Sequence, residues 1–259
     1  MRIVYFANNK VGLESLKYLR SRNDADIVGL VLHPNDRARF RDELISESGL
    51  PADKVFDGSN LRSPEIIDQI RKLEPDLGLS VFFGYILRRP LIGLFPSGCL
   101  NLHPAYLPFN RGAHPNVWSI VDGTPAGVTL HYIDEGIDTG DIVMQRRVET
   151  FPHDTGETLY RRLETACVDL MRSTWPLVEA GTADAVPQDP DEGTYHSSSD
   201  LAALDRIVLD EAYTASHIIN IIRARTFPPY SGTYFEHEGM RVYLCLEMSP
   251  DGDADQKED

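Results

Sequence analysis

The first hundred residues alternate short apolar runs with segments of helical periodicity, and this alternation constrains the fold more than any other feature. Apolar runs that are long enough for one strand each lie at 2–7 (RIVYFA), 25–34 (ADIVGLVLHP), 77–84 (LGLSVFFG) and 98–103 (GCLNLH). Runs of this kind are typical of strands buried on both faces of a parallel sheet. Segments with helical spacing or helix-start signals lie between them, at 13–22, 41–48 and 63–73. A short edge strand is predicted at 54–58.

The rest of the chain continues this pattern and then changes character. The predicted elements are strands at 126–134 and 141–149, a long amphipathic helix at 155–181, a polar turn-rich linker at 184–200, a helix at 212–226 and a hairpin at 232–247 that turns at Glu238-Gly239. Strands that alternate with helices indicate an α/β fold, a Rossmann-like, doubly wound and mostly parallel sheet. We predict a catalytic domain at 1–182, a small C-terminal α/β subdomain at 183–250 that ends in a β-hairpin, and a disordered acidic tail at 251–259.

The charge balance restricts the partners. The chain carries 40 acidic against 25 basic residues, a formal net charge of −15. Nucleic-acid binding depends on basic residues that contact phosphates, so an acidic total weighs against a nucleic-acid partner. It leaves room for a local basic pocket that holds a small phosphate ligand.

Three sequence features indicate a cytoplasmic protein with no membrane partner. No run of about 18 apolar residues is present, and the N-terminal MRIVYFANN lacks the regions of a signal peptide. Cys99, Cys167 and Cys245 lie far apart, each within an apolar pattern. We expect them to be buried free thiols in a reducing compartment.

Asn101 and His103 form the first candidate site. Side chains alternate faces along a strand, so these two point the same way, and Pro104 should end the strand because it cannot donate to a ladder. The pair then lies at the carboxyl end of a strand, where open α/β sheets bind ligands. This placement favours a catalytic role over that of an ordinary hydrogen-bonded histidine.

The loop at 131–142 (HYIDEGIDTGDI) is the second candidate. A strand ends there at Asp134, and Asp138 follows in a loop between Gly136 and Gly140; acid-rich glycine loops can bind cations. However, neither the EF-hand spacing nor HExxH is present. Histidines 103, 114 and 131 match no common zinc-ligand spacing. We therefore expect no metal site.

The third candidate is NNKVG at 8–12, which follows the first apolar run. It is not GxGxxG, so a dinucleotide fingerprint is not supported. Exposed amides at a helix start, together with Lys10, can hold a phosphate. An ordinary turn between strand and helix explains the segment equally well.

Two longer stretches, NLHPAYLPFNRG (101–112) and HPNVWSIVDGTPAGVTLHYIDEGIDTGDIV (114–143), resemble the folate-dependent formyltransferase family. That family includes glycinamide ribonucleotide transformylase, methionyl-tRNA formyltransferase and the sugar N-formyltransferases. Its pattern is met here by Asn101, His103, Leu107, Pro108, Arg111, Gly112, Trp118 and Asp138. RARTFPPY (223–230) is similar to the sugar enzymes. The tRNA enzyme has Pro-Trp-Pro-Gly there and a further basic β-barrel, for which we expect no room in this chain.

The resemblance implies transfer of a formyl group from 10-formyltetrahydrofolate to the amine of a nucleotide-linked amino sugar, for example a dTDP-amino-dideoxyhexose, in O-antigen and lipopolysaccharide biosynthesis. It implies a catalytic set of Asn101, His103 and Asp138. The implied folate-binding residues are Phe83, Gly84, Tyr85, Ile86, Leu87 and Asp134, and the candidate substrate-binding residues are Asn8, Asn9 and Lys10. It also makes a homodimer plausible, paired through the C-terminal hairpin.

Other interpretations stay open at this point. Within the resemblance, the acceptor can be methionyl-tRNA or another small amine. A formyltetrahydrofolate deformylase ranks last, because the sensing domain that such enzymes carry at the N-terminus is not seen. A non-enzymatic protein or an oxidoreductase with the same doubly wound fold is disfavoured by the missing glycine fingerprint and by the complete set of Asn101, His103 and Asp138.

Overall fold

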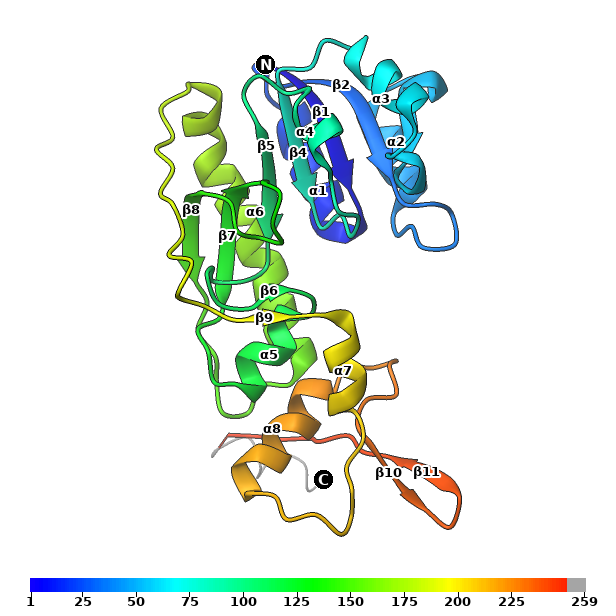
Figure 1. The fold of residues 1–259 in the computed structure, drawn as a ribbon, viewed down its shortest axis with the longest axis vertical. Coiled ribbons are helices and arrows are strands. Elements are labelled where there is room, and N and C mark those ends of the chain that lie inside the picture. Colours follow the sequence, from blue (N-terminus) through cyan, green and yellow to red (C-terminus); the bar gives the residue numbers. More distant parts are fainter. Residues whose placement is uncertain (251–259) are drawn as a thin grey trace, which may run out of the picture.

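A seven-stranded sheet forms the centre of the protein in the computed structural model, which describes residues 1–250. The predicted acidic tail, 251–259, lies outside the described residues. The strands are β1 (Arg2–Ala7), β2 (Asp26–Leu32), β3 (Val55–Asp57), β4 (Leu77–Val81), β5 (Cys99–His103), β7 (Gly127–Tyr132) and β8 (Ile142–Arg147). Their order is β3-β2-β1-β4-β5-β7-β8. The first five are parallel, and β7 and β8 add antiparallel. The predicted doubly wound, mostly parallel sheet is thus confirmed (Figure 1).

Helices cover both faces of this sheet. The helices in chain order are α1 (Asn9–Arg20), α2 (Arg41–Ser48), α3 (Pro64–Arg71), α4 (Arg89–Ile92), α5 (Pro115–Val121) and α6 (Gly156–Glu179), and α7 (Ser198–Leu204) and α8 (Ala215–Arg225) follow in the C-terminal part, away from the sheet (Figure 1). Along β1, Ile3 and Tyr5 pack in the core shared with α1 and α6, while Val4 and Phe6 pack in the core shared with α3 and α4. This two-sided burial explains the uninterrupted apolar runs in the sequence.

Several helix boundaries differ from the sequence prediction. Helix α1 begins at Asn9, four residues before the predicted start, so most of NNKVG is helical rather than loop. Val11 and Gly12 are buried in its first turns. Helix α3 begins as predicted, with the Ser63 side chain accepting a hydrogen bond from the Ile66 amide. The short helices α4, α5 and α7 were not predicted, because segments of four to seven residues carry too little periodicity.

Helix α6 runs along one face of the sheet for 24 residues. It starts with a capping box in which Thr155 and Thr158 exchange hydrogen bonds between side chain and backbone. Near its end the fully buried Trp175 donates from Nε1 to Oδ1 of Asp24 at 3.3 Å. Because it contacts α1, α5, β7 and β8, α6 joins the parallel and antiparallel halves of the sheet.

Beyond α6 the chain crosses the carboxyl side of the sheet before it enters the C-terminal part (Figure 1). The two-residue strand β9 (Tyr195–His196) pairs with β6 (Arg111–Gly112) during this crossing. Helix α8 packs on α5, and the predicted hairpin follows as β10 (Tyr234–His237) and β11 (Met240–Tyr243). Glu238 and Gly239, with φ of 47° and 79°, form its turn, as predicted.

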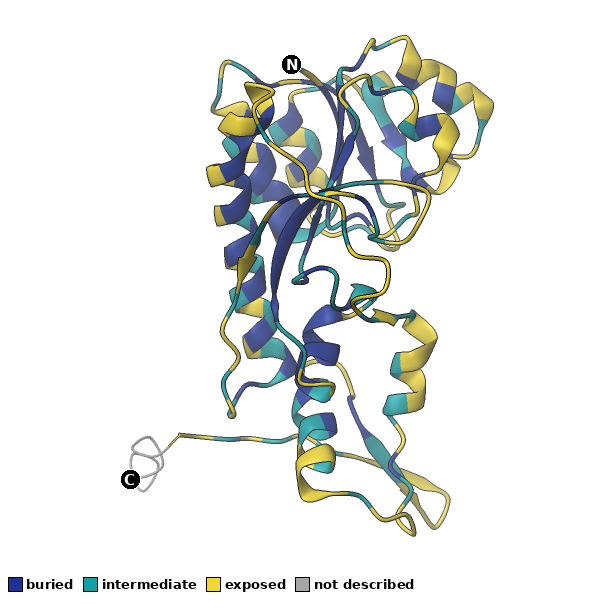
Figure 2. Ribbon diagram, turned by 60° about the vertical axis from the view of Figure 1, so that its left-hand side comes forward, coloured by how far each residue is buried: buried dark blue, intermediate teal, exposed yellow. Residues whose placement is uncertain are grey.

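Burial is uneven between the two ends of the molecule. The inner strands of the large sheet are buried and its edge strand β8 is largely exposed, whereas the hairpin and α7 are mostly exposed (Figure 2). Cys99 and Cys167 are buried free thiols as predicted, but Cys245 is exposed, and the prediction for it was wrong. It follows β11, where nothing in residues 1–250 covers the chain closely enough to bury it. No helix in the described part of the chain is both long and apolar enough to span a membrane.

Candidate active site

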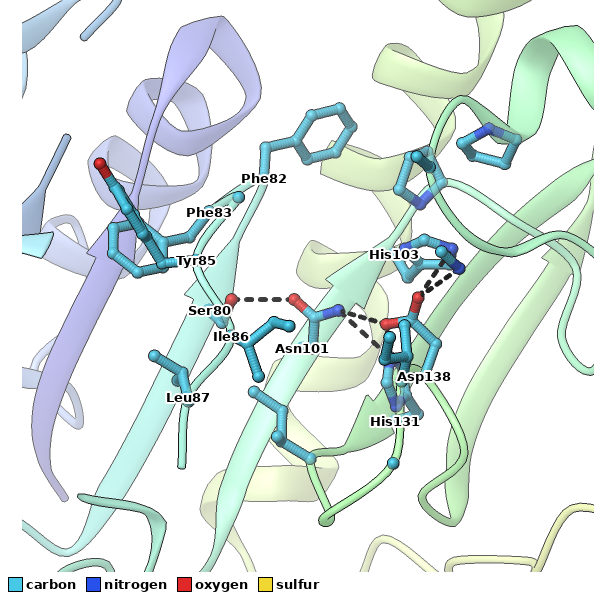
Figure 3. Close-up of a pocket in the computed structure, with 18 of the residues that line it drawn as sticks. Ser80, Phe82, Phe83, Tyr85, Ile86, Leu87, Asn101, His103, His131 and Asp138 are labelled. Atoms are coloured by element: carbon cyan, nitrogen blue, oxygen red, sulfur yellow. Dashed lines mark hydrogen bonds and ion pairs between the residues drawn. The ribbon is translucent and has the colours of Figure 1, made fainter. Parts of the chain in front are cut away.

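A pocket of about 480 Å³ opens at the carboxyl ends of β4 and β5. Its walls come from five parts of the chain: the strand ends, the segment after β4, the segment from β6 to the start of α5, the loop between β7 and β8, and the crossing segment around β9. Figure 3 shows the polar side chains gathered on one side and the residues that follow β4 on the other. The carboxyl edge of the sheet is where the sequence placed Asn101 and His103.

The amide of Asn101 is oriented by partners on both of its ends. Oδ1 accepts a hydrogen bond from the hydroxyl of Ser80 on β4 at 2.9 Å. Nδ2 faces Nε2 of His131 at 3.2 Å and Oδ1 of Asp138 at 3.5 Å. The Asp138 carboxylate can only accept, so it fixes which end of the amide carries the donor, and the NH2 group points toward the other polar side chains (Figure 3).

His103 is buried, and its ring faces two oxygen acceptors. Nε2 lies 3.3 Å from the carbonyl oxygen of Asn110 and 3.6 Å from Oδ2 of Asp138. Two acceptors on this nitrogen favour a tautomer with the proton on Nε2. The side chain of Asn110 is itself fixed, because its amide donates to the hydroxyls of Ser119 and Thr124, both at 2.9 Å.

His131 belongs to the same cluster, although its position in the sequence suggested only a possible zinc ligand. It lies on β7 directly opposite Asn101 in the antiparallel register. Burial lowers its pKa, against the opposing attraction of the Asp138 carboxylate, so the ring is neutral at pH 7. Nδ1 donates to the carbonyl oxygen of Tyr132 at 2.8 Å, which leaves Nε2 as an acceptor for Asn101.

Asp138 reaches this cluster from the loop between β7 and β8, with φ of 55°. Left-handed backbone at a non-glycine residue costs about 1–3 kcal/mol and persists where the surroundings hold it. Here the backbone amide of Gly112 donates to Oδ2 at 2.8 Å, and Nε2 of Gln188 donates to the backbone oxygen at 2.8 Å. Asn101, His103 and Asp138, predicted from separate motifs, are thus brought together.

The predicted folate-binding residues all line the pocket; they are Phe83, Gly84, Tyr85, Ile86, Leu87 and Asp134. The rings of Phe83 and Tyr85 pack against each other and against His33, whose Nε2 accepts a hydrogen bond from the Gly84 amide at 3.2 Å. Ile86 is 59% exposed at the pocket wall. These contacts hold an open, mainly apolar wall opposite the polar cluster.

Asp134 accepts two hydrogen bonds inside its own loop. Its Oδ1 accepts from the Gly136 amide at 3.0 Å and from the Thr139 hydroxyl at 2.7 Å. These hydrogen bonds stabilise the turn that positions Asp138 beside Asn101 and His103. Among residues 1–250, no group of three or more His, Cys, Asp or Glu side chains is arranged to hold a metal ion.

The three predicted substrate-binding residues lie at the end of β1, outside the described lining of the pocket. Oδ1 of Asn8 accepts from the Arg39 amide at 2.8 Å, and Nδ2 of Asn9 donates to the hydroxyl of Tyr160 at 3.3 Å. Lys10 is exposed on α1. The geometry leaves their function as a prediction.

The crossing segment adds residues to the site that the sequence indicated only as a linker. Tyr195 and His196 line the pocket, and the ring of His196 stacks on Trp118 with centroids 3.8 Å apart. Nε2 of His196 also lies 2.9 Å from Oδ2 of Asp122. A polar run between two domains carries no signal for such contacts, because they join segments that are far apart along the chain.

The cluster as a whole combines oriented donors with a carboxylate that can accept a proton. An amide NH2 and an imidazole N–H lie on either side of Asp138, in a pocket whose other wall is apolar. Such an arrangement suits a reaction in which negative charge develops on an oxygen while a proton moves. Acyl transfer between a bound donor and an amine has both requirements.

Comparisons with known proteins agree with this chemistry. A formyl transferase family model matches residues 1–174, and a model of the N-formyltransferase dimerization C-terminal domain matches residues 200–250. Methionyl-tRNA formyltransferase of Geotalea daltonii is 32% identical over 265 residues, covering 98% of this chain and 82% of that protein.

Two solved structures are similar in sequence and fold. A 4-N formyltransferase from Francisella tularensis is 28% identical with a TM-score of 0.82, over 96% of this chain and 98% of that one. The formyltransferase PseJ from Anoxybacillus kamchatkensis, in complex with UDP-4,6-dideoxy-4-formamido-L-AltNAc and tetrahydrofolate, is 28% identical with a TM-score of 0.56, over 78% of this chain and 89% of that one. With a family model matched over its first 174 residues, this chain belongs to the formyltransferase family.

Proposed function

We propose that this protein transfers the formyl group of 10-formyltetrahydrofolate to the amine of a nucleotide-linked amino sugar. The observation that carries the proposal is the convergence of Asn101, His103 and Asp138 on one pocket, with contacts of 3.5–3.6 Å among them. The family match supports formyl transfer, and the PseJ complex holds tetrahydrofolate and a formylated UDP-sugar.

The pocket fits a folate on size and on chemistry. Its volume of about 480 Å³ lies within the range of small-molecule sites. Tyr85 and the exposed Ile86 offer apolar surface to a flat ring, and the exposed Gly84 leaves backbone groups accessible to polar ring edges. We assign the folate to the wall formed by residues 83–87 and the loop that contains Asp134.

Each of the three polar residues has a role in the transfer. The folate supplies an activated formyl group on a nitrogen. Asn101 and His103 donate hydrogen bonds to the formyl oxygen as negative charge builds on it, and donors of this kind are worth about 3 kcal/mol each. Asp138 accepts the proton that the attacking amine releases, directly or through His103 or one water. The same groups then return a proton to the departing nitrogen, so that the charges balance.

The acceptor is the less constrained part of the proposal. The Francisella tularensis protein is described as a 4-N formyltransferase, and the PseJ structure holds a formylated UDP-sugar; both support an amino sugar as the acceptor. The relative from Geotalea daltonii favours methionyl-tRNA as the second candidate. A net charge of −15 opposes binding of a long polyanion, whereas a pyrophosphate needs one or two cations and a few amides.

For the nucleotide phosphates we propose the start of α1. Asn8 and Asn9 are at its first turn, Lys10 is exposed there, and helix N-termini favour anions. We also propose a homodimer formed through the C-terminal part, supported by the match to the dimerization domain at 200–250.

An acceptor panel tests the proposal. The protein is mixed with 10-formyltetrahydrofolate and dTDP-, UDP- or GDP-linked amino sugars in one set, and with methionyl-tRNA in the other. We expect a formyl mass increment on one sugar and none on the tRNA. Efficient formylation of the tRNA with every sugar unmodified would refute the sugar assignment. Formyl loss to water at the same rate with and without any amine would refute the assignment as a transferase.

A further inference from the structure

We propose that Gln188 is a positioning residue that sets the catalytic carboxylate of Asp138, so that the crossing segment between α6 and α7 is part of the catalytic apparatus. The inference rests on the formyl transfer proposed above. Gln188 does not line the pocket, and it contacts the backbone of Asp138 rather than its carboxylate.

The amide of Gln188 bridges two segments that meet at Asp138. Nε2 donates to the backbone oxygens of Asp138 and Gly140, at 2.8 and 2.7 Å. At the other end of the amide, Oε1 accepts from Nε and Nη2 of Arg111 at 3.1 and 2.9 Å. Two carbonyls on one side and a guanidinium on the other leave one orientation of the amide that satisfies all four contacts.

These contacts close a ring around the carboxylate. Arg111 is followed by Gly112, whose amide donates to Oδ2 of Asp138 at 2.8 Å. Gly112 therefore holds the side chain of Asp138, and Gln188 holds its backbone. Arg111 links these two residues, because it precedes Gly112 in the chain and donates to the side chain of Gln188. A residue with φ of 55° needs such support to stay in place. Loss of the Gln188 amide releases the backbone side of the ring.

Other contacts hold the crossing segment, so Gln188 is not needed simply to attach it. The backbones of Val186 and Ile142 exchange two hydrogen bonds at 2.8 and 2.9 Å. The Thr194 amide donates to the oxygen of Pro108 at 3.2 Å, and its carbonyl accepts from the Arg111 amide at 2.9 Å. These backbone bonds survive a change of the Gln188 side chain, so its effect on Asp138 can be measured separately.

The first test is kinetic, on the full chain with the acceptor found in the panel. Gln188→Ala and Gln188→Glu should lower kcat about 10- to 100-fold, because a misplacement near 1 Å costs about that much, with KM values changed less than about threefold. In the second variant the new carboxylate can still pair with Arg111, but it has no donor for the two carbonyls. Gln69→Glu, an exposed site on α3 with the same change of charge, should match the parent protein.

A double-mutant cycle separates positioning from a general structural role. On an Asp138→Asn background, measured in single turnover, Gln188→Ala should cost less than about threefold, since the group that it positions is already lost. An equal fold-loss in both backgrounds, or a Gln188→Ala variant with the parent kcat, would overturn the inference.

A second readout needs no acceptor, so it distinguishes failure of this inference from failure of the proposed function. The Gly112 amide reports on Asp138 because it donates to Oδ2. Its hydrogen exchange should be faster in Gln188→Ala than in the parent and in Gln69→Glu, at an unchanged melting temperature. Unchanged exchange at Gly112 contradicts the proposed ring, even if the panel yields no acceptor.

Discussion

The carboxylate of Asp138 places one oxygen near each of two histidine rings. Oδ2 is 3.6 Å from Nε2 of His103, and Oδ1 is 3.6 Å from Nε2 of His131. The two rings differ in what else they contact: His131 donates from Nδ1 to a backbone carbonyl, whereas Nε2 of His103 faces both Asp138 and Asn110. His131 therefore acts as a neutral acceptor that orients Asn101, whereas His103 carries its proton on Nε2, the nitrogen that we propose donates to substrate.

The three polar residues should be needed together. We predict that Asn101→Ala, His103→Ala and Asp138→Ala each lower kcat by at least about 100-fold, because each removes a donor or the proton acceptor. Double variants should cost little more than the worst single variant, since the residues act as one unit. Steady-state kinetics and circular dichroism check this. Full activity in folded His103→Ala would contradict the mechanism.

The buried His131 should make stability depend on pH. Its pKa is lowered in the folded protein, so the unfolded chain binds the proton first as the pH falls through about 6.5. Stability is then lost toward acid, by about 1.4 kcal/mol per pH unit for one proton. We expect a shallower slope between about pH 6.5 and 5 in His131→Gln than in the parent.

Urea unfolding at several pH values measures these slopes. His33 and His114, whose pKa values burial also lowers, contribute to the slope that remains in the variant. His237→Gln, at an exposed position of β10, serves as the control and should keep the parent slope. Parallel curves for the parent and His131→Gln would show that His131 is not the group responsible.

At the scale of elements, α6 depends on a defined start. Its capping box satisfies the amides of both Thr155 and Thr158, two groups at an end that intrahelical bonds leave open. Buried residues from Leu159 to Trp175 then follow on the face toward the sheet. The cap therefore lies at one end of the helix that joins both halves of the sheet.

We predict that Thr155→Ala lowers the free energy of unfolding by about 1 kcal/mol, the usual cost of a lost N-cap. The matched variant Thr165→Ala removes a hydroxyl from an exposed position inside the same helix, where alanine is the better helix former, and should cause no loss. Urea unfolding of both variants checks the prediction. Equal destabilisation by the two variants would remove the capping explanation.

At the scale of the whole molecule, the hairpin is the surface that we propose contacts the second subunit of the dimer. Met240 and Val242 share one face of β11 and are 61% and 39% exposed, and Phe235 lies opposite Val242 on β10. The other face of β11 carries Arg241 and Tyr243, and Arg241 is near Glu236. An exposed apolar face on a two-stranded hairpin is unusual for a free surface.

We predict that Met240→Asp combined with Val242→Asp shifts a dimer to monomer at micromolar concentration, because charge then enters the apolar contact. Arg241→Gln, on the opposite face, should keep the dimer. Light scattering after size-exclusion chromatography measures the mass of each. A parent protein that is monomeric across this range would contradict the proposed dimer.

Sequence by itself determined the features that depend on local periodicity. Uninterrupted apolar runs predicted the buried strands, because both faces of β1, β2 and β4 are covered by helices. The spacing of two between Asn101 and His103 placed both on one face of a strand, and Pro104 ended it. The same rules failed where segments were short, as in α5, or where burial needed a distant neighbour, as at Cys245.

Only the tertiary structure decided which distant residues complete the site. Antiparallel pairing of β5 with β7 sets His131 opposite Asn101, and the crossing segment brings Gln188 to the backbone of Asp138. Neither contact leaves a periodic trace in the sequence, because each joins residues 30 to 50 positions apart through a single register or a single side chain. The residues proposed to be catalytic were therefore predictable from the sequence, while the groups that hold them in place depend on how the segments of the chain pack.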